Sequence, residues 1–357
     1  MLDLILLTLF VIFIFHQCYW RRLHLPPGPT PLPILGNLLS LDANDIDNQL
    51  IEYKKQYGNI FTVWIANATV IVGGHEAMKS IFIKNGDKVV GRTNFVVLED
   101  IFGGMLGIAN ASDSLWKNQR KFFLHVLRDF GVGKPVLENA IITQASDVCA
   151  YFKSLNGTPI SLTKIFSTCV GNIIYQLMFG TTVNLEDDSI YKNRNDILEI
   201  SKVFHHPFTL LATIWEPLKY LRVFAGPSYH DKIKISKNMA EYFTKQIVEH
   251  RGTCDFDGEP RDYIDAFLIE QRKQNPSLNE GEWSDRQLVA IMFDVFSAGF
   301  ETTGTTLEMF ILYMLYYPKV QTKIHEEIDR VIGKDKTITI SSTNCYRNTA
   351  KFISSCN

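Results

Sequence analysis

A polar hexapeptide interrupts the most apolar helical stretch of this chain. Residues 284–316 have the periodicity of one long helix, and most of its positions are apolar. Within it, residues 298–303 read Ala-Gly-Phe-Glu-Thr-Thr. An acid and hydroxyls on a core helix need partners or a task, because burying a polar group without a hydrogen bond costs roughly 2–7 kcal/mol. The stretch therefore predicts a central core helix, and the hexapeptide is the first candidate for a functional site.

Length and charge narrow the class of protein. The 357 residues can bury a substantial core, and a hydrophobic content of 46% with 21% charged residues is ordinary for a globular chain. The formal net charge is −2, and Lys and Arg form no dense run. These features give no indication of nucleic-acid binding.

The cysteines indicate the redox compartment. The six cysteines are scattered and form no C-x-x-C pair, so the spacing resembles neither a zinc site nor a disulfide framework. Scattered cysteines in a chain of this size favour a reducing compartment. Cys149 and Cys169 have apolar sequence neighbours, which predicts that both are core residues.

The N-terminus predicts a membrane anchor over residues 1–22. The segment 2–20 is almost purely apolar and just long enough to span a bilayer as a helix. Asp3 precedes the apolar run, and Arg21 and Arg22 follow it. A cleaved signal peptide is the alternative, but it has its positive charges before the apolar run. Positive charges after it place the body of the protein in the cytosol.

A proline-rich segment follows the anchor. Five prolines within residues 26–33 exclude a helix and favour an extended, semi-rigid spacer. One interpretation of residues 23–37 is a generic linker. The position directly behind an anchor favours a hinge that holds a catalytic body in a fixed orientation against the membrane.

The rest of the chain predicts a mainly α fold with a small β portion. Residues 60–65 and 69–73 are β-branched and aromatic, and the short connection between them predicts a hairpin. Helical periodicity then dominates, over 75–85, 113–130, 135–155, 161–179, 189–205, 227–251, 261–273, 284–316 and 317–332. Residues 340–357 are polar and poorly patterned, which predicts a tail without stable structure.

Several motifs in this order resemble the cytochrome P450 family of haem-thiolate monooxygenases, in its microsomal form. The anchor and the Pro-Pro-Gly-Pro segment come first, and later landmarks are W-x-x-x-R at 116–120, the hexapeptide, and Tyr-Pro-Lys-Val-Gln at 317–321. W-x-x-x-R alone is a weak signal, whereas the ordered set is specific. The resemblance implies a cytochrome P450-like fold, incomplete at the C-terminus, with a partial catalytic domain over 38–339 and a divergent tail over 340–357.

The resemblance implies haem as the cofactor and assigns residues to it. Trp116 and Arg120 lie four residues apart on one helix face and offer an indole N–H and a guanidinium, which suit a buried haem propionate. Arg92 matches a family position that also reaches a propionate, and a surface arginine is the equal alternative. Ala298 and Gly299 would lie against the macrocycle, since glycine leaves room for close approach.

The resemblance also assigns the catalytic and substrate residues. Glu301 and Thr302 match the acid and alcohol that deliver protons to dioxygen at the haem iron. From the residues themselves, Thr302 can bond back to the carbonyl of Ala298 and loosen the helix, and two satisfied core hydroxyls are the structural alternative. Phe296 and Phe300, together with Ala298, would lie near a small apolar substrate.

Residues 208–224 are rich in large apolar groups and match the family segment that roofs the pocket and dips toward the membrane. An ordinary packed helix is the alternative. The adjacent His205 and His206 suggest a metal site only superficially, because neighbours on a helix point in different directions.

The C-terminal region departs from the family pattern. The family holds its iron through a cysteine in F-x-x-G-x-R-x-C-x-G, and neither Cys345 nor Cys356 has that setting. Glu327 and Arg330 fit the letters E-x-x-R, but they lie on the preceding helix and predict only a surface pair. Without the thiolate, the chain as it stands is predicted to be inactive.

Two hypotheses on function follow from these motifs. The first is an endoplasmic reticulum monooxygenase with a single N-terminal anchor and a cytosolic body. It would use dioxygen, electrons from an NADPH-dependent reductase and a small apolar substrate. The second is a non-catalytic product: a truncated isoform, a pseudogene product or a mis-predicted gene model.

Overall fold

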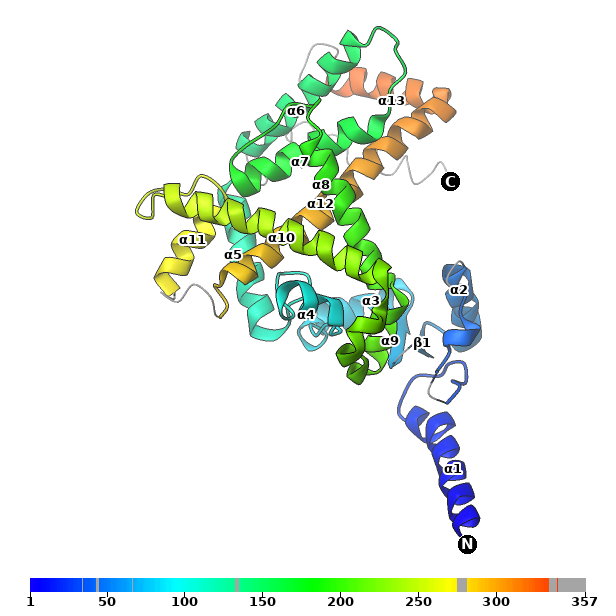
Figure 1. Ribbon diagram of the computed structural model, residues 1–357. Coiled ribbons are helices and arrows are strands. Elements are labelled where there is room, and N and C mark those ends of the chain that lie inside the picture. Colours follow the sequence, from blue (N-terminus) through cyan, green and yellow to red (C-terminus); the bar gives the residue numbers. More distant parts are fainter. Residues whose placement is uncertain are drawn as a thin grey trace. The chain divides into compact units, whose positions relative to one another are not determined.

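Two groups of elements make up the chain, which a computed structural model describes over residues 1–33, 35–42, 45–65, 67–131, 135–274, 281–333 and 339 (Figure 1). The first unit comprises residues 1–96 and 206–225. The second unit comprises residues 97–205 and 226–357. Each unit is described by itself below.

The first unit combines the N-terminal helix with a β-hairpin and short helices. Its elements are α1 (Leu2–Cys18), η1 (Trp20–Arg22), η2 (Leu38–Ser40), α2 (Ile46–Tyr57), β1 (Ile60–Trp64), β2 (Ala68–Val72), α3 (His75–Met78), the π-helix η3 (Lys79–Lys84), η4 (Gly86–Lys88), α9 (Pro207–Ile214) and η6 (Glu216–Ala225). β1 and β2 pair antiparallel, with Ile60 opposite Val72 and Trp64 opposite Ala68. The predicted hairpin is confirmed.

The proline-rich segment is held against strand β1. The amide of Thr62 donates to the carbonyl of Pro27 at 2.8 Å, and the amide of Trp64 donates to Oδ1 of Asn37 at 2.9 Å. A Cβ on Gly28 would lie 1.9 Å from the carbonyl oxygen of Thr62, so only glycine permits this approach. The segment therefore makes specific contacts with the body of its unit.

The basic pair after the anchor helix also has partners within this unit. The guanidinium of Arg21 lies 4.3 Å from the ring centroid of Trp64, within cation–π range. Arg22 donates to the carbonyl of Gly28 at 2.9 Å. These contacts connect the end of the anchor helix to the proline-rich segment and to β1.

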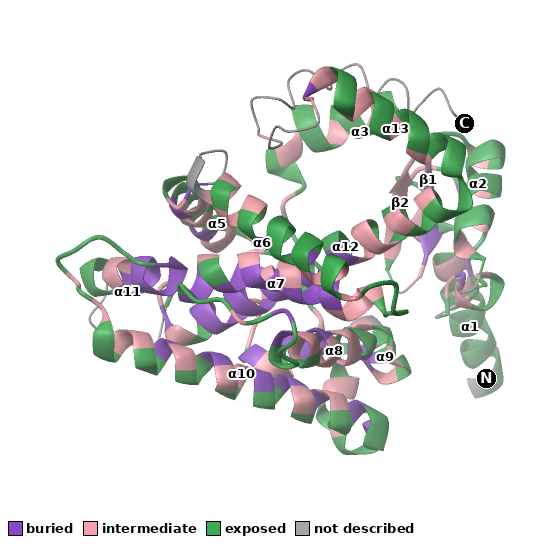
Figure 2. Ribbon diagram, turned by 90° about the horizontal axis from the view of Figure 1, so that it is seen from above, coloured by how far each residue is buried: buried purple, intermediate pink, exposed green. Residues whose placement is uncertain are grey.

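The second unit is helical. Its elements are α4 (Val96–Phe102), α5 (Asp113–Asp129), α6 (Pro135–Ser154), α7 (Leu162–Phe179), α8 (Ser189–Ser201), η5 (Lys202–His205), α10 (Pro227–Thr253), α11 (Tyr263–Gln274), α12 (Asp285–Tyr316) and α13 (Pro318–Val331). α12 packs against α7, α8 and α10 (Figure 1). Figure 2 shows α7 as largely buried and α13 as largely exposed.

α12 is one continuous helix over the predicted core stretch. The hydroxyl of Ser284 accepts from the amide of Gln287 at 3.3 Å and caps the N-terminus. The helix ends at Tyr316, and Pro318 opens α13, as the sequence predicts. The local loosening expected at Thr302 does not interrupt the helix.

Most predicted helices are confirmed within one or two residues at each end. The sequence analysis gave no helix for α2 or α4. α4 has only 7 residues and therefore gives a weak periodic signal, whereas α2 has 12 residues, as many as the predicted α11. The predicted tail over 340–357 lies outside the described residues.

Candidate functional site

One exposed face of α12 carries two of the small residues of the hexapeptide. Ala298 and Thr302 lie one turn apart, and both are exposed. The Thr302 hydroxyl donates to the carbonyl oxygen of Ala298 at 2.8 Å, which confirms the predicted back-bond. The face at this turn is therefore flat, with one hydroxyl at its edge.

Gly299 serves the packing between α12 and α7. A Cβ on Gly299 would lie 2.4 Å from Cδ1 of Ile174, below any normal contact distance. The missing side chain therefore makes room for Ile174. The structure thus gives this glycine a packing role, and its contact with a macrocycle stays a prediction.

Glu301 points toward helix α8. Its Oε2 lies 2.6 Å from a guanidinium nitrogen of Arg194, and the Arg194 side chain is only 10% exposed. Its Oε1 accepts from the Thr305 hydroxyl at 3.0 Å. Glu301 and Thr302, predicted to act together, therefore lie on adjacent sides of α12 in this structure.

Phe296 and Phe300 are core residues. They are 0% and 1% exposed, and their ring centroids lie 5.1 Å apart. The Phe296 ring also packs on Tyr175, Phe179 and Phe243 at centroid distances of 5.4, 5.4 and 5.1 Å. Packing alone accounts for both rings, and substrate contact stays an untested prediction for them.

A cavity of about 270 Å³ lies beside this part of α12. It lies between α4, α8, η5 and α12. Most of its lining is apolar, and the lining residues are Leu98, Ile101, Phe102, Asn110, Ile197, Ile200, Ser201, Phe204, His205, Phe293, Asp294 and Ser297. A mainly apolar concave site with a few polar groups is the usual form of a small-molecule site.

Asp294 and Gln287 fix the loop that closes one side of this region. Oδ2 of Asp294 accepts from the amides of Ile108 and Ala109 at 2.6 and 2.8 Å. The Gln287 amide bonds both backbone groups of Gly107 at 3.0 Å each. Burial raises the pKa of Asp294 to about 6, and the two amide donors oppose that shift.

The predicted propionate partners Trp116 and Arg120 share one face of α5. Arg120 is exposed, and its guanidinium lies 5.6 Å from the centroid of the Trp116 ring. Arg92 belongs to the first unit, where it is exposed and bonds the carbonyl of Val90. The pairing of Trp116 with Arg120 is therefore present, and their contact with haem stays a prediction.

Burial suppresses thiolate formation at two of the cysteines in the described residues. Burial raises the pKa of both Cys169 and Cys254 to about 11, so both are neutral thiols at pH 7. Cys169 packs beside a small core cluster, as predicted. The core prediction for Cys149 is wrong, because that residue is exposed.

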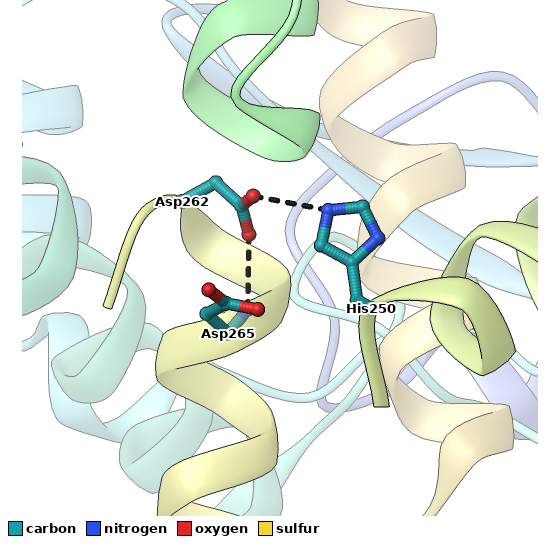
Figure 3. Close-up of side chains that lie close together, drawn as sticks. All are labelled: His250, Asp262 and Asp265. Carbon is teal, nitrogen blue, oxygen red and sulfur yellow. Dashed lines mark hydrogen bonds and ion pairs between the residues drawn. The ribbon is translucent and has the colours of Figure 1, made fainter. Parts of the chain in front are cut away.

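A second cluster of titratable groups joins α10 and α11 (Figure 3). Ligand atoms of His250, Asp262 and Asp265 lie within 4.8 Å of one another, as in a metal site. Asp262 Oδ2 lies 3.0 Å from Nε2 of His250, and both oxygens of Asp265 accept from Arg261. The two carboxylates thus have His250 and Arg261 as partners, which favours a network of hydrogen bonds and ion pairs over a metal site.

The histidines at 205 and 206 have separate roles, as predicted. His205 lines the cavity, and Nδ1 of His206 accepts from the amide of Phe208 at the start of α9.

The cavity is the part of the site that the sequence analysis missed. Asp294 lies in the same apolar run as Glu301, so the argument from burial applied to it equally. The other lining residues come from four separate segments and carry no shared motif.

Comparison with known proteins identifies close relatives of the chain. The sequence profile described as Cytochrome P450 matches residues 26–347. Cytochrome P450 2C28 of Mesocricetus auratus is 36% identical over 344 residues, which cover 93% of this chain and 67% of the relative. Cytochrome P450 2C8 of Homo sapiens is 36% identical over 326 residues, with coverages of 89% and 64%.

A nematode relative aligns over nearly the whole chain. Probable cytochrome P450 CYP36A1 of Caenorhabditis elegans is 29% identical over 353 residues, which cover 98% of this chain and 71% of the relative. The chain thus spans about two thirds of the length of the curated relatives that it matches.

Proposed function

Because the chain belongs to the cytochrome P450 family, we propose that the whole protein is a haem-dependent monooxygenase that inserts one oxygen atom from dioxygen into a small apolar organic substrate. The activity is assigned to the whole protein, since this chain spans about two thirds of its relatives' length. Electrons would come from an NADPH-dependent reductase partner.

The main support for this proposal is that the cavity lies next to the exposed face of α12 that carries Ala298 and Thr302. Asp294 and Ser297 line the cavity, and Ala298 follows directly on the same helix. Asp294, Ala298 and Thr302 are spaced four residues apart and therefore follow one side of α12. A substrate in the cavity would thus lie beside the surface on which the oxygen chemistry is proposed.

The residues on this face fit a haem group. Ala298 and Thr302 leave a flat, exposed surface that a planar macrocycle can cover, and Trp116 and Arg120 offer donors suited to its propionates. When bound, haem with a thiolate ligand supplies the activation of dioxygen.

Thr302 and Glu301 are the proposed proton-handling residues. The Thr302 hydroxyl is exposed on the same face as Ala298, where it could hold a proton for the oxygen chemistry that haem would supply. The Glu301 carboxylate lies on the α8 side, paired with Arg194. Glu301 would supply protons to Thr302 only after it leaves Arg194 or through bridging water.

The first unit supports an attachment to the endoplasmic reticulum membrane with a cytosolic body. In the part of the chain that the structure describes, the helix over Asp3–Arg22 is long and apolar enough to cross a bilayer. Large apolar side chains are also exposed in the same unit, including Trp215 between α9 and η6 at 59% and Phe224 in η6 at 79%. Such a surface suits a membrane interface.

Haem titration tests the proposal. The chain in lipid nanodiscs should bind haem at one equivalent, and Ala298→Trp should abolish binding by filling the flat face. Leu312→Trp, at an exposed position on the same helix, is the control and should bind as the parent does. An Ala298→Trp variant that binds haem as the parent chain does would contradict the proposed position of haem on this face.

The reduced carbon-monoxide difference spectrum tests the prediction of inactivity. We expect no thiolate-type Soret band from the 357 residues alone, and the appearance of one would show that this chain supplies its own iron ligand.

Three possible N-glycosylation sites test the membrane topology. They lie at Asn67, Asn110 and Asn156, which are exposed or partly buried. A cytosolic body leaves them without glycans, and a mass shift on deglycosylation would place the body in the lumen.

A further inference from the structure

In the cavity beside α12, only one of the two carboxylate oxygens of Asp294 accepts hydrogen bonds from the described residues. Both loop amides bond the same oxygen of Asp294, Oδ2, at 2.6 and 2.8 Å. Among the described residues, the other oxygen, Oδ1, has no hydrogen-bond partner. A carboxylate can accept about four hydrogen bonds, so Asp294 can both hold the loop and bind a ligand.

Four polar side chains accompany Asp294 in the cavity lining: Asn110, Ser201, His205 and Ser297. The Ser201 hydroxyl already donates to the carbonyl of Leu198 at 2.8 Å. Ser297 and Asn110 also have no hydrogen-bond partner within the described ranges of the chain. The remainder of the lining is mostly aliphatic and aromatic side chains of α4, α8 and α12. Groups that accept hydrogen bonds therefore stand in a site that is otherwise apolar.

We propose that this cavity takes a small ligand with an apolar body and a protonated amine, and that Oδ1 of Asp294 receives the amine. This names the substrate class of the proposed function and rests on it. An ammonium group donates three hydrogen bonds, and the side-chain oxygens of Asp294, Ser297 and Asn110 can accept them. Anions are disfavoured, because a carboxylate in an apolar site repels like charge strongly.

Charge and size support this choice of ligand. The pKa of Asp294, raised by burial to about 6, still leaves the group mainly ionised at pH 7.5. A hydrogen bond between ionised partners is roughly twice as strong as a neutral one. The volume of about 270 Å³ lies just below the usual range of about 300–1,000 Å³ for ligand sites, which limits the ligand to small molecules.

The test compares two matched probes on the full chain in nanodiscs by calorimetry at pH 7.5. 4-Phenylbutylamine is protonated at this pH, whereas 4-phenylbutan-1-ol is neutral and of similar size. We expect the amine to bind at least tenfold more tightly than the alcohol. Equal affinities, or tighter binding of the alcohol, would overturn the proposal.

Variants assign the preference to Asp294. Asp294→Asn keeps an oxygen that can accept from the loop amides and removes the charge, so the amine should lose its advantage. Glu308→Gln is the control, since Glu308 is a carboxylate on the same helix outside the cavity lining. An amine preference that survives in Asp294→Asn would contradict the proposal.

A second variant covers the case in which Asp294→Asn does not fold. Ser297→Lys places a cation beside Asp294 and should weaken amine binding at least tenfold while it changes alcohol binding less. Unchanged amine binding in this variant would also contradict the proposal. The haem titration is a separate measurement, so failure of either proposal can be recognised independently of the other.

Discussion

The two halves of α12 have similar apolar composition and opposite environments. In the first half, the run from Leu288 to Phe293 is entirely buried, with exposures of 0 to 7%. In the second half, Met309, Phe310 and Leu312 are 44 to 48% exposed, and Tyr316 is 74% exposed. The difference therefore does not come from the helix itself.

The neighbouring helices determine which half is buried. Around the first half, α7 and α10 supply rings on more than one side, as shown by the contacts of Phe296 with Phe179 and Phe243. Along the second half, Leu307 and Ile311 pack on the small cluster of α6 and α7, and the opposite side has no cover within the described residues. Apolar sequence thus predicts burial only where partners exist.

The largest expected effect comes from truncating the same residue type in each half. Phe296→Ala should lower the free energy of unfolding by about 3–5 kcal/mol, because it opens a cavity among packed rings. Phe310→Ala should cost about 1 kcal/mol, because that ring is 47% exposed. Urea unfolding followed by circular dichroism measures both. Equal losses would show that the second half is covered in solution.

The glycines of α12 give a second contrast. Gly299→Ala should destabilise by about 1–3 kcal/mol, because its Cβ would lie 2.4 Å from Cδ1 of Ile174. Gly304→Ala is the matched control. Its nearest neighbour is Ser167 Oγ at 3.9 Å, so the helix propensity of alanine should stabilise by up to about 1 kcal/mol. The same sign for both variants would contradict the packing role of Gly299.

A partly buried ion pair and an exposed ion pair give a third contrast. A double-mutant cycle with Arg194→Met and Glu301→Gln should give a coupling of about 1–2 kcal/mol, since Arg194 is 10% and Glu301 38% exposed. The pair Arg330 with Glu327 on α13 is the control, at 3.8 Å and with Arg330 74% exposed. It should couple by less than about 0.5 kcal/mol. A coupling near zero for Arg194 with Glu301 would show that this ion pair does not stabilise the contact between α8 and α12.

Local patterns predicted the elements of this fold well, and they predicted its contacts poorly. The hairpin and the long helices follow from β-branched runs and helical periodicity, which are properties of adjacent residues. The use of Gly299 against Ile174 and of Glu301 against Arg194 depends on α7 and α8, which are far away in the sequence. A hexapeptide alone does not reveal which side of a helix meets which neighbour.

The same limit applies to the site. Ala298 and Thr302 lie on an exposed face, and Thr302 makes the back-bond that the sequence predicts. The cavity is built from four separate segments, so its polar corner at Asp294 becomes visible only when those segments are packed together. The hexapeptide indicated from the sequence that α12 belongs to the functional site. The cavity beside α12 can be recognised only in the packed structure.

The smallest expected effect concerns the helices that surround the first half of α12. Asp262 raises the pKa of His250 above its usual value, mainly through their hydrogen bond. His250 also contacts the carbonyl of Gln246 at 2.7 Å, so the ring donates at both nitrogens when it is protonated. Because the pKa of His250 is higher in the folded state, the stabilisation by protonated His250 is complete below pH of about 6.5. This stabilisation is lost as the pH rises through the pKa of His250 in the folded protein.

His250→Gln isolates that contribution. The stability difference between the parent and this variant, measured by urea unfolding from pH 6 to pH 9, should be on the order of 1 kcal/mol at pH 6 and shrink as the pH rises. Asp294 titrates in both proteins and therefore cancels in the difference. A difference that stays constant with pH would mean that His250 acts through packing, and the burial of the first half of α12 would then rest on apolar contacts alone.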